Sequence, residues 1–233
     1  MSLYRNRGLI AGGQRTSIAT ASVGATITGS VVTAVTAAAG IAGSQEPIAD
    51  RIVAIAMSLG EAGAGVTISG CTINGIPAPV WVQENQAGAL AFICSANIPF
   101  GVADRRFRFR GILSASGATA GNGVFDISRG SSCYSPVSYT SSGAAIDTAR
   151  TATLSCWPSG LVIAAATNDV ATANSCAWTG TVGVVEDYDE AAGTARISGA
   201  SDNTPTAGEA QTAIATFAVT SVAGISLAAA SFR

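Results

Sequence analysis

The stretch Arg105-Arg106-Phe107-Arg108-Phe109-Arg110 indicates most clearly which kind of fold the chain adopts. Successive side chains of a β-strand point to opposite faces, so alternating charged and apolar residues predict a strand with one face on a core. The residues expected to point outward are Arg106, Arg108 and Arg110, and those expected to enter the core are Phe107 and Phe109. We expect this arginine row to face another subunit or an anionic surface such as an acidic glycan, the alternative being a solvated strand face with no partner.

The rest of the chain predicts an all-β fold. Residues 49–57 and 161–166 are near-continuous apolar runs, which are typical of central strands covered on both faces. Asn74-Gly75 predicts a hairpin with a type I′ turn, and Pro77 and Pro79 limit its return strand to an edge. About a dozen short strands separated by Gly, Pro, Asn and Ser turns predict an antiparallel β-sandwich or jelly roll. The two apolar runs sit in blocks that echo each other, as two halves of one jelly roll would, and the alternative is a chance similarity between sequences rich in Ala, Val, Gly and Thr.

The chain divides by pattern into two parts. Residues 1–30 are expected to form an extended N-terminal docking arm that carries Tyr4, Arg5, Arg7 and Arg15, and residues 31–233 a single β-sandwich domain. The apolar segment of the arm is too short for a secretory signal. Residues 16–45 carry no charge but contain no Leu or Phe, so we expect no membrane span. The Ser/Gly-rich residues 128–143 are expected to form an irregular surface loop.

The composition excludes several kinds of chemistry. All 12 basic residues are Arg, against 14 acidic residues, and there is no His and no Lys. The missing His removes Ser-His-Asp and Cys-His catalysis and the commonest zinc ligand, and the missing Lys removes Schiff-base chemistry. A net charge of −2 provides no basic field to attract nucleic acid. Because no pair of carboxylates stands out either, we expect a non-enzymatic protein without a cofactor.

The cysteines are expected to be structural. There are five of them, widely spaced and without a C-x-x-C motif, and an odd number cannot all pair within one chain. We predict free thiols that act as small core residues, with one disulfide as the alternative. The five are Cys71, Cys94, Cys133, Cys156 and Cys176.

The densest acidic segment is Glu186-Asp187-Tyr188-Asp189-Glu190. One hypothesis is that its carboxylates meet the arginine row, between protomers or between sheets, because Arg–carboxylate pairs fix the register of two surfaces. The alternatives are a polar hairpin tip and a calcium site. Asp187 and Asp189 have the spacing of calcium ligands, but no turn glycine or distal Glu completes the pattern, so we predict no metal.

Exposed aromatic residues are candidates for stacking on sugar rings. Tyr134 and Tyr139 fall in the expected surface loop, and Trp157 precedes Pro158 at the end of a strand. Trp81 stands between Val80 and Val82 in a strand, so we assign it to the core.

Five segments, taken in order, resemble a known group of proteins. They are Asp50-Arg-Ile-Val-Ala-Ile-Ala56, Thr67-Ile-Ser-Gly-Cys-Thr-Ile-Asn-Gly-Ile-Pro-Ala78, Leu90-Ala-Phe-Ile93, Ile98-Pro-Phe-Gly101 and the terminal Ala-Ala-Ala-Ser-Phe232. This order is similar to the "strand, I-x-G-V-x-A hairpin, V-P-x-G" block of small β-sandwich fibre, spike and decoration proteins of tailed phages and gene transfer agents. The resemblance covers roughly residues 45–233.

The resemblance implies a surface protein of a virion that is assembled in the host cytoplasm. It further implies a homo-oligomer, with a trimer favoured, that is anchored to other virion proteins by its N-terminal segment. The residues that carry the likeness are structural, and none is an active-site residue. The alternative is a free-standing carbohydrate-binding or adhesive module.

Overall fold

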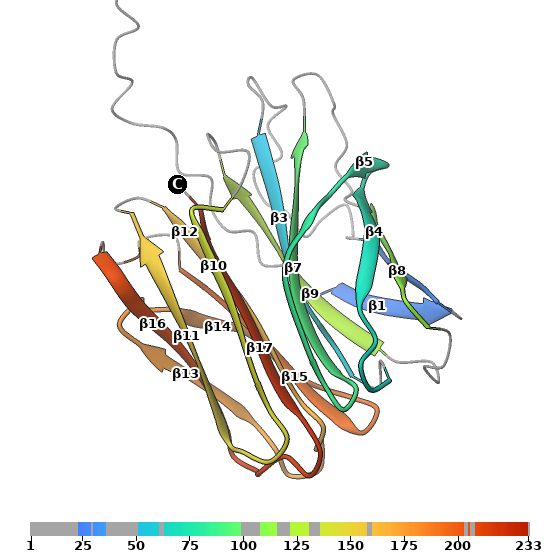
Figure 1. Ribbon diagram of the computed structural model, residues 1–233, viewed down its shortest axis with the longest axis vertical. Coiled ribbons are helices and arrows are strands. Elements are labelled where there is room, and N and C mark those ends of the chain that lie inside the picture. The colour runs from blue at the N-terminus through green and yellow to red at the C-terminus, as the bar shows by residue number, and fades with distance from the viewer. Residues whose placement is uncertain are drawn as a thin grey trace, which may run out of the picture.

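The computed structural model describes residues 23–28, 30–35, 51–60, 63–98, 108–115, 122–130, 136–157, 160–202, 205 and 208–232. These residues form 17 strands and no helix, which confirms the predicted all-β class (Figure 1). All strand pairs among them are antiparallel. The strands are β1 (Val23–Thr28), β2 (Val31–Val35), β3 (Arg51–Leu59), β4 (Ile68–Ile73), β5 (Ile76–Pro77), β6 (Val80–Gln86), β7 (Ala89–Ile98), β8 (Arg108–Leu113), β9 (Asn122–Gly130), β10 (Ser138–Ala144), β11 (Ala149–Cys156), β12 (Leu161–Asn168), β13 (Cys176–Gly180), β14 (Val185–Ala192), β15 (Ala195–Asp202), β16 (Gly208–Phe217) and β17 (Ile225–Phe232).

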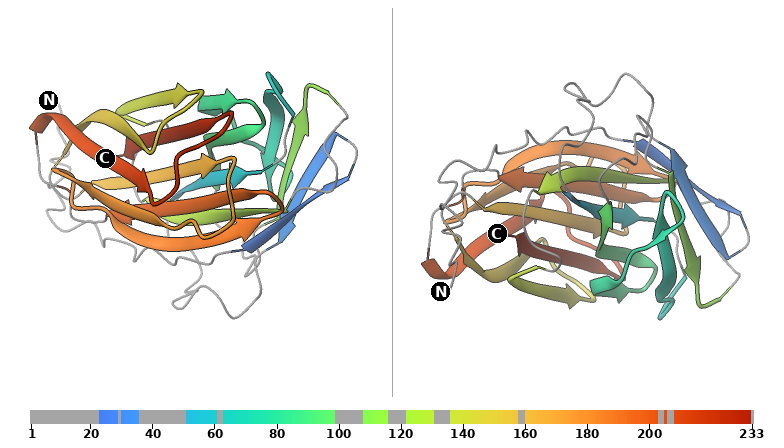
Figure 2. Two further views of the ribbon diagram at one scale, coloured as in Figure 1. Left: turned by 90° about the horizontal axis from the view of Figure 1, so that it is seen from below. Right: turned by 90° about the horizontal axis from the view of Figure 1, so that it is seen from above.

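The strands divide into two halves along the chain. The first half, β1–β9, is one nine-stranded sheet with the order β5-β4-β8-β2-β1-β9-β3-β7-β6. The second half, β10–β17, is a five-stranded sheet, β10-β17-β12-β15-β14, and a three-stranded sheet, β11-β16-β13. The halves lie side by side, with the blue-to-green strands on one side and the yellow-to-red strands on the other (Figures 1 and 2). Each half has its own apolar core, and a third apolar cluster joins them.

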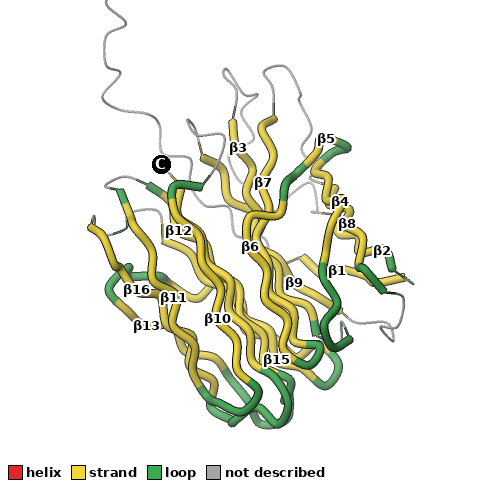
Figure 3. The backbone as a smooth tube through the Cα atoms, in the orientation of Figure 1, coloured by secondary structure: helices red, strands yellow, loops and turns green. Residues whose placement is uncertain are grey.

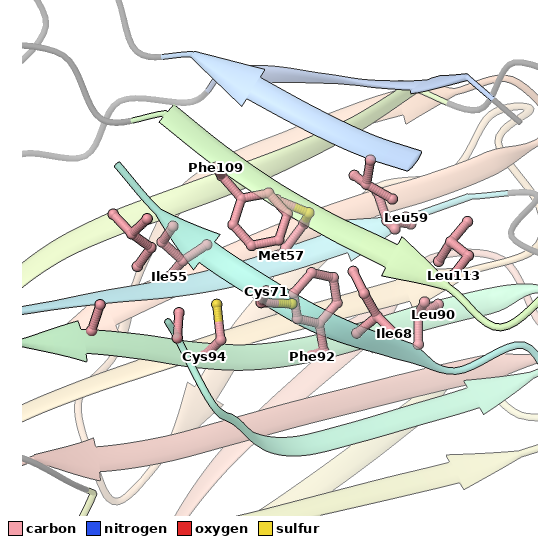
Figure 4. Close-up of a cluster of buried hydrophobic side chains, with 14 of the residues drawn as sticks. Ile55, Met57, Leu59, Ile68, Cys71, Leu90, Phe92, Cys94, Phe109 and Leu113 are labelled. Atoms are coloured by element: carbon pink, nitrogen blue, oxygen red, sulfur yellow. The ribbon is translucent and has the colours of Figure 1, made fainter. Parts of the chain in front are cut away.

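Strand β3 is buried on both faces, as its sequence predicts. It lies between β9 and β7, and its residues 52–59 are all buried. Because strand residues alternate, one set enters the core of the first half and the other faces the second half. The first set is Val53, Ile55, Met57 and Leu59, of which the last three are drawn with Phe92 and Phe109 in Figure 4. The second set is Ile52, Ala54 and Ala56.

Small side chains dominate the interface between the halves. The first half contributes Ile52, Ala54, Ala56, Ala91 and Ile93, and the second half contributes Leu161, Ile163, Ala165, Ala228, Ala230 and Phe232. The two apolar runs that echo each other in the sequence therefore face each other in neighbouring sheets. Alanine methyl groups are short, so the two backbones approach closely while apolar surface is still removed from water.

Two glycines lie at points where the halves approach most closely. A Cβ atom added to Gly60 would lie 2.6 Å from the Cβ of Ala195. A Cβ atom added to Gly224 would overlap the backbone carbonyl of Gln86. Only glycine lets the backbone come this near another chain segment without displacing it.

Buried hydroxyl groups add directed contacts across the same interface. Each of the following bonds links a residue of one half to a residue of the other, and most end on backbone carbonyls. Ser226 Oγ donates to Ala89 O (2.7 Å), Thr167 Oγ1 to Leu90 O (3.2 Å), Ser58 Oγ to Ser198 O (3.1 Å) and Tyr188 Oη to Ser58 Oγ (3.1 Å). Buried polar groups cost free energy unless they are paired, so these bonds favour one alignment of the halves.

Side-chain amides connect the two edges of the nine-stranded sheet. The sheet curls until β4 and β6 approach each other around the first-half core. Gln83 accepts the Ile68 N–H through Oε1 at 2.8 Å and donates Nε2 to the Ile68 carbonyl at 3.4 Å. Asn85 Nδ2 donates to the carbonyls of Gly63 and Val66 at 2.9 and 2.7 Å. An amide side chain carries the same donor and acceptor as a peptide group, so these residues replace strand-to-strand bonds.

The predicted hairpin and the predicted state of the thiols are confirmed. Asn74 and Gly75 have φ angles of 53° and 79°, as a type I′ turn requires, and the return strand β5 has only two residues. Cys71, Cys94, Cys156 and Cys176 are buried free thiols, and Cys133 lies outside the described residues. Contact with the Cys71 thiol, together with burial, raises the pKa of Cys94.

One boundary prediction is wrong. Residues 128–143 are not a continuous loop, because β9 extends to Gly130 and β10 begins at Ser138. β10 is an edge strand that pairs only with β17, and an edge tolerates its small polar side chains. Residues 23–28, which fall within the predicted arm, form β1 and pair with β2 and β9. Residues 1–22 lie outside the described part of the chain.

We predict that Ala165→Leu lowers the free energy of unfolding by about 1–3 kcal/mol, because the added carbons must fit between two closely packed sheets. The measurement is urea-induced unfolding followed by tryptophan fluorescence. Ala177→Leu is the matched control, since Ala177 is exposed on β13, and its effect should stay within about 0.5 kcal/mol. Equal effects of the two substitutions would contradict a tightly packed interface.

Candidate functional site

The edge strands β6 and β10 belong to different halves and lie next to each other (Figure 3). Their side chains touch along the length of both strands, and we call this line of contact the seam. The seam consists of Trp81, Glu84 and Gln86 on β6 and Tyr139, Ser141 and Gly143 on β10. Because Tyr139, Ser141 and Gly143 alternate with the other residues of β10, they share the strand face that meets β6.

An aromatic pair occupies one end of the seam. The ring centroids of Trp81 and Tyr139 are 6.3 Å apart, with an angle of 45° between the planes. A break in strand register between Val80 and Val82 leaves Trp81 in a bulge, and its Nε1 donates to Ser95 Oγ at 2.7 Å. Tyr139 is 52% exposed, whereas Trp81 is half-buried. Trp81 is therefore not the core residue that its sequence neighbours predict.

A carboxylate follows the aromatic pair along the seam. Glu84 is half-buried and accepts a hydrogen bond from Ser141 Oγ through Oε2 (3.1 Å) and one from Gln86 Nε2 through Oε1 (3.0 Å). Gly143 leaves room for these groups, because a Cβ atom there would lie 2.6 Å from Gln86 Cγ. Glu84 is thus held between Ser141 and Gln86.

The arginine row lies on the outer face of β8. Arg108 and Arg110 are exposed and Phe109 is buried, so the predicted alternation is confirmed for these three residues; Arg106 lies outside the described part of the chain. Phe109 packs near Phe92 in the first-half core, with ring centroids 6.0 Å apart. Neither Arg108 nor Arg110 forms an ion pair in the part of the chain that the structure describes.

The acidic segment lies along an edge strand and not at a hairpin tip as its composition suggested. Glu186, Asp187, Asp189 and Glu190 belong to β14, which pairs only with β15. The turn to β15 is made by Gly193 at φ 63°, where a left-handed backbone favours glycine. A register break between Glu186 and Tyr188 places a bulge in this strand. Charges and bulges on an edge strand oppose pairing with strands of other molecules.

Asp189 forms an ion pair and hydrogen bonds that stabilise the second half. Arg196 donates Nε to Asp189 Oδ1 at 2.7 Å and Nη2 to Oδ2 at 2.6 Å, and this pairing raises the pKa of Arg196. Asp189 Oδ2 also accepts the N–H of Cys176 at 3.1 Å. This bond joins β14 to β13, an edge strand of the three-stranded sheet. Burial raises the pKa of the Cys176 thiol to about 12. The carboxylate therefore accepts three hydrogen bonds within the second half.

The remaining acids of β14 are more accessible. Glu186 and Glu190 are exposed, and Asp187 is half-buried. Partial burial, and then the negative charge of Asp189, raise the pKa of Glu186. The pairing of acids and arginine row that was expected between sheets is not found among the described residues, and pairing between protomers stays a prediction.

The other predicted site residues are distributed as follows. Trp157 is 45% exposed at the end of β11, as expected. Tyr134 and the arm residues Tyr4, Arg5, Arg7 and Arg15 lie outside the described part of the chain. Within the described ranges, no three His, Cys, Asp or Glu side chains gather in a group suited to a metal ion.

Sequence reasoning missed Trp81 and Glu84 as members of one surface site. Glu84 looked like an isolated acid, and β10, which supplies the partners of both residues, was assigned to a loop. The bulge that turns Trp81 toward Tyr139 has no marker in the sequence such as a glycine, so only the strand register reveals it.

No family model, no curated protein and no solved structure matches this chain. Among the residues that the structure describes, no helix is long and apolar enough to cross a membrane. The site must therefore be judged from its own residues.

We predict that Asp189→Asn lowers the free energy of unfolding by about 3 kcal/mol, because Arg196 keeps its charge in a largely buried position after losing its partner. The side chains of Arg196 and Asp189 are only 19% and 11% exposed. The measurement is chemical unfolding at neutral pH. Glu190→Gln, on the exposed part of the same strand, is the control and should change stability by less than about 0.5 kcal/mol. A similar small change for Asp189→Asn would show that the pair is dispensable.

Proposed function

We propose that this chain is a non-enzymatic structural protein of a virion, a head fibre, a decoration protein or a tail appendage. In this proposal the N-terminal arm docks to the particle, and the packed sheets, connected as a jelly roll, form the exposed part. The two-cored architecture supports the proposal, because a surface protein must keep its shape while it is exposed on a particle. The likeness of the sequence pattern to phage surface proteins points the same way.

The single observation that carries the proposal is the placement of opposite charges on the two halves. Arg108 and Arg110 lie on the outer face of the first half without an ion pair among the described residues, and the exposed Glu186 and Glu190 lie on an edge strand of the second half. A basic surface on one part of a molecule and an acidic surface on another suit a head-to-tail contact between copies. Such contacts close into a ring when the rotation between successive copies allows it, and we favour a trimeric ring.

We predict that the protein self-associates at low salt and that the triple variant Arg106→Ser, Arg108→Ser, Arg110→Ser remains a monomer. Salt should weaken the wild-type assembly, because the contact is electrostatic and exposed. Sedimentation velocity at low and high ionic strength measures both effects. Glu209→Gln, which removes an exposed charge on β16, is the control and should leave the assembly intact. A wild-type protein that stays monomeric at every salt concentration would contradict the proposal.

We also predict that deletion of residues 1–20 abolishes incorporation into particles while the sheets stay folded. The docking arm supplies the contact to the particle in this proposal, and β1 begins only at Val23. Particle pull-down from cells that assemble the virion measures incorporation, and circular dichroism checks the fold. Normal incorporation of the truncated chain would place the docking surface elsewhere.

A free-standing carbohydrate-binding or adhesive module is the second candidate function. The observation in its favour is the exposure of two aromatic side chains, Tyr139 and Trp157, at 52% and 45%. Exposed aromatic residues are frequent anchors for ligands, since they supply a large rigid surface. This function is compatible with attachment of a virion to a host surface glycan.

A further inference from the structure

We propose that the seam between β6 and β10 binds a neutral pyranose unit of an oligosaccharide, with Tyr139 and Trp81 as the stacking surface and Glu84 as the acceptor for sugar hydroxyls. The inference rests on the second candidate function and names its site and ligand class. It does not depend on self-association through the arginine row.

The aromatic pair forms a preorganised stacking surface, because one of its two rings is held in place before any ligand binds. Trp81 is fixed by its bond to Ser95, which is 2% exposed, and by the bulge that turns it toward the second half. Tyr139 leans against this fixed ring at an angle of 45° while half of its own surface remains open to solvent. A ligand that covers Tyr139 would therefore order few additional groups, and the entropic cost of binding stays low.

A polar acceptor stands at a suitable distance from the exposed ring. Tyr139 and Ser141 point the same way from β10 and are two residues apart, which corresponds to about 7 Å along a strand. Ser141 holds Glu84 by a hydrogen bond of 3.1 Å. A sugar ring stacked on Tyr139 would thus place hydroxyl groups at one of its edges near the carboxylate.

Glu84 keeps acceptor capacity after its contacts within the chain are counted. An ionised carboxylate offers about four lone-pair sites, and Ser141 and Gln86 each use one. Hydrogen bonds from neutral hydroxyl groups to a charged acceptor are among the stronger ones. Glu84 as a residue is half-buried and so keeps contact with solvent.

The charge of the seam selects the kind of sugar. Glu84 is the charged member of the seam, so an acidic sugar would be repelled and a neutral sugar with several hydroxyl donors is favoured. This distinguishes the seam from the arginine row, where an anionic glycan was expected.

The test is isothermal titration of the full chain with maltotriose, cellotriose and triacetylchitotriose as neutral probes and 3′-sialyllactose as the acidic probe. We expect at least one neutral trisaccharide to bind and 3′-sialyllactose to bind more weakly. Tyr139→Ala should weaken binding about tenfold, because the variant loses both the stacked aromatic contact and the apolar area that the ring covers. Tyr139→Phe should bind as the wild type does, and Glu84→Gln should bind more weakly.

Val185→Ala is the control and should bind as the wild type does, since Val185 is 69% exposed on β14, at the opposite edge of the five-stranded sheet from β10. Trp157→Ala tests the other exposed aromatic residue. One contrary result is that a neutral trisaccharide binds, that Trp157→Ala abolishes binding and that Tyr139→Ala does not. That result would show that the seam is not the sugar-binding site, and it would still support a carbohydrate-binding function. If no neutral trisaccharide binds the wild type, the inference is wrong, and if 3′-sialyllactose does not bind either, the second candidate function is wrong as well. The sedimentation experiment tests the virion proposal separately, and melting temperatures show whether each variant is folded.

Discussion

The structure depends on one packing constraint, the close contact of two sheets through an interface of small side chains. β3 of the first half and β12 of the second half are each buried on both faces. Each strand packs against the core of its own half on one face and against the other half on the opposite face. Alanine at positions such as 54, 56, 165 and 228 permits this, because larger residues would push the sheets apart.

Polar groups align the halves that the apolar interface brings together. Apolar contact is not directional, whereas the hydroxyl bonds from Ser58, Thr167 and Ser226 to the opposite half each require one position. The charged residues differ in how they are used. Asp189 forms an ion pair with Arg196 within the second half, whereas Arg108 and Arg110 are exposed on β8, where a partner could contact them.

Much of the local structure was predictable from the sequence, but the candidate site was not. The doubly covered strands, the type I′ turn at Asn74-Gly75 and the buried thiols each follow from local pattern and residue chemistry. The seam joins residues that are more than fifty positions apart, and its second strand has a polar, Ser-rich sequence that resembles a loop. Edge strands carry a weaker hydrophobic signal than central strands, which is why β10 escaped recognition.

The sequence by itself determined the all-β class, the strand alternation of Arg108, Phe109 and Arg110, and the absence of histidine and lysine chemistry. These properties depend on residue type and on contacts between near neighbours. Only the tertiary structure decided that the two apolar runs face each other, that Asp189 pairs with Arg196, and that Trp81 meets Tyr139. Those contacts arise from the register of strands and the packing of sheets, which join distant residues whose proximity no local pattern encodes.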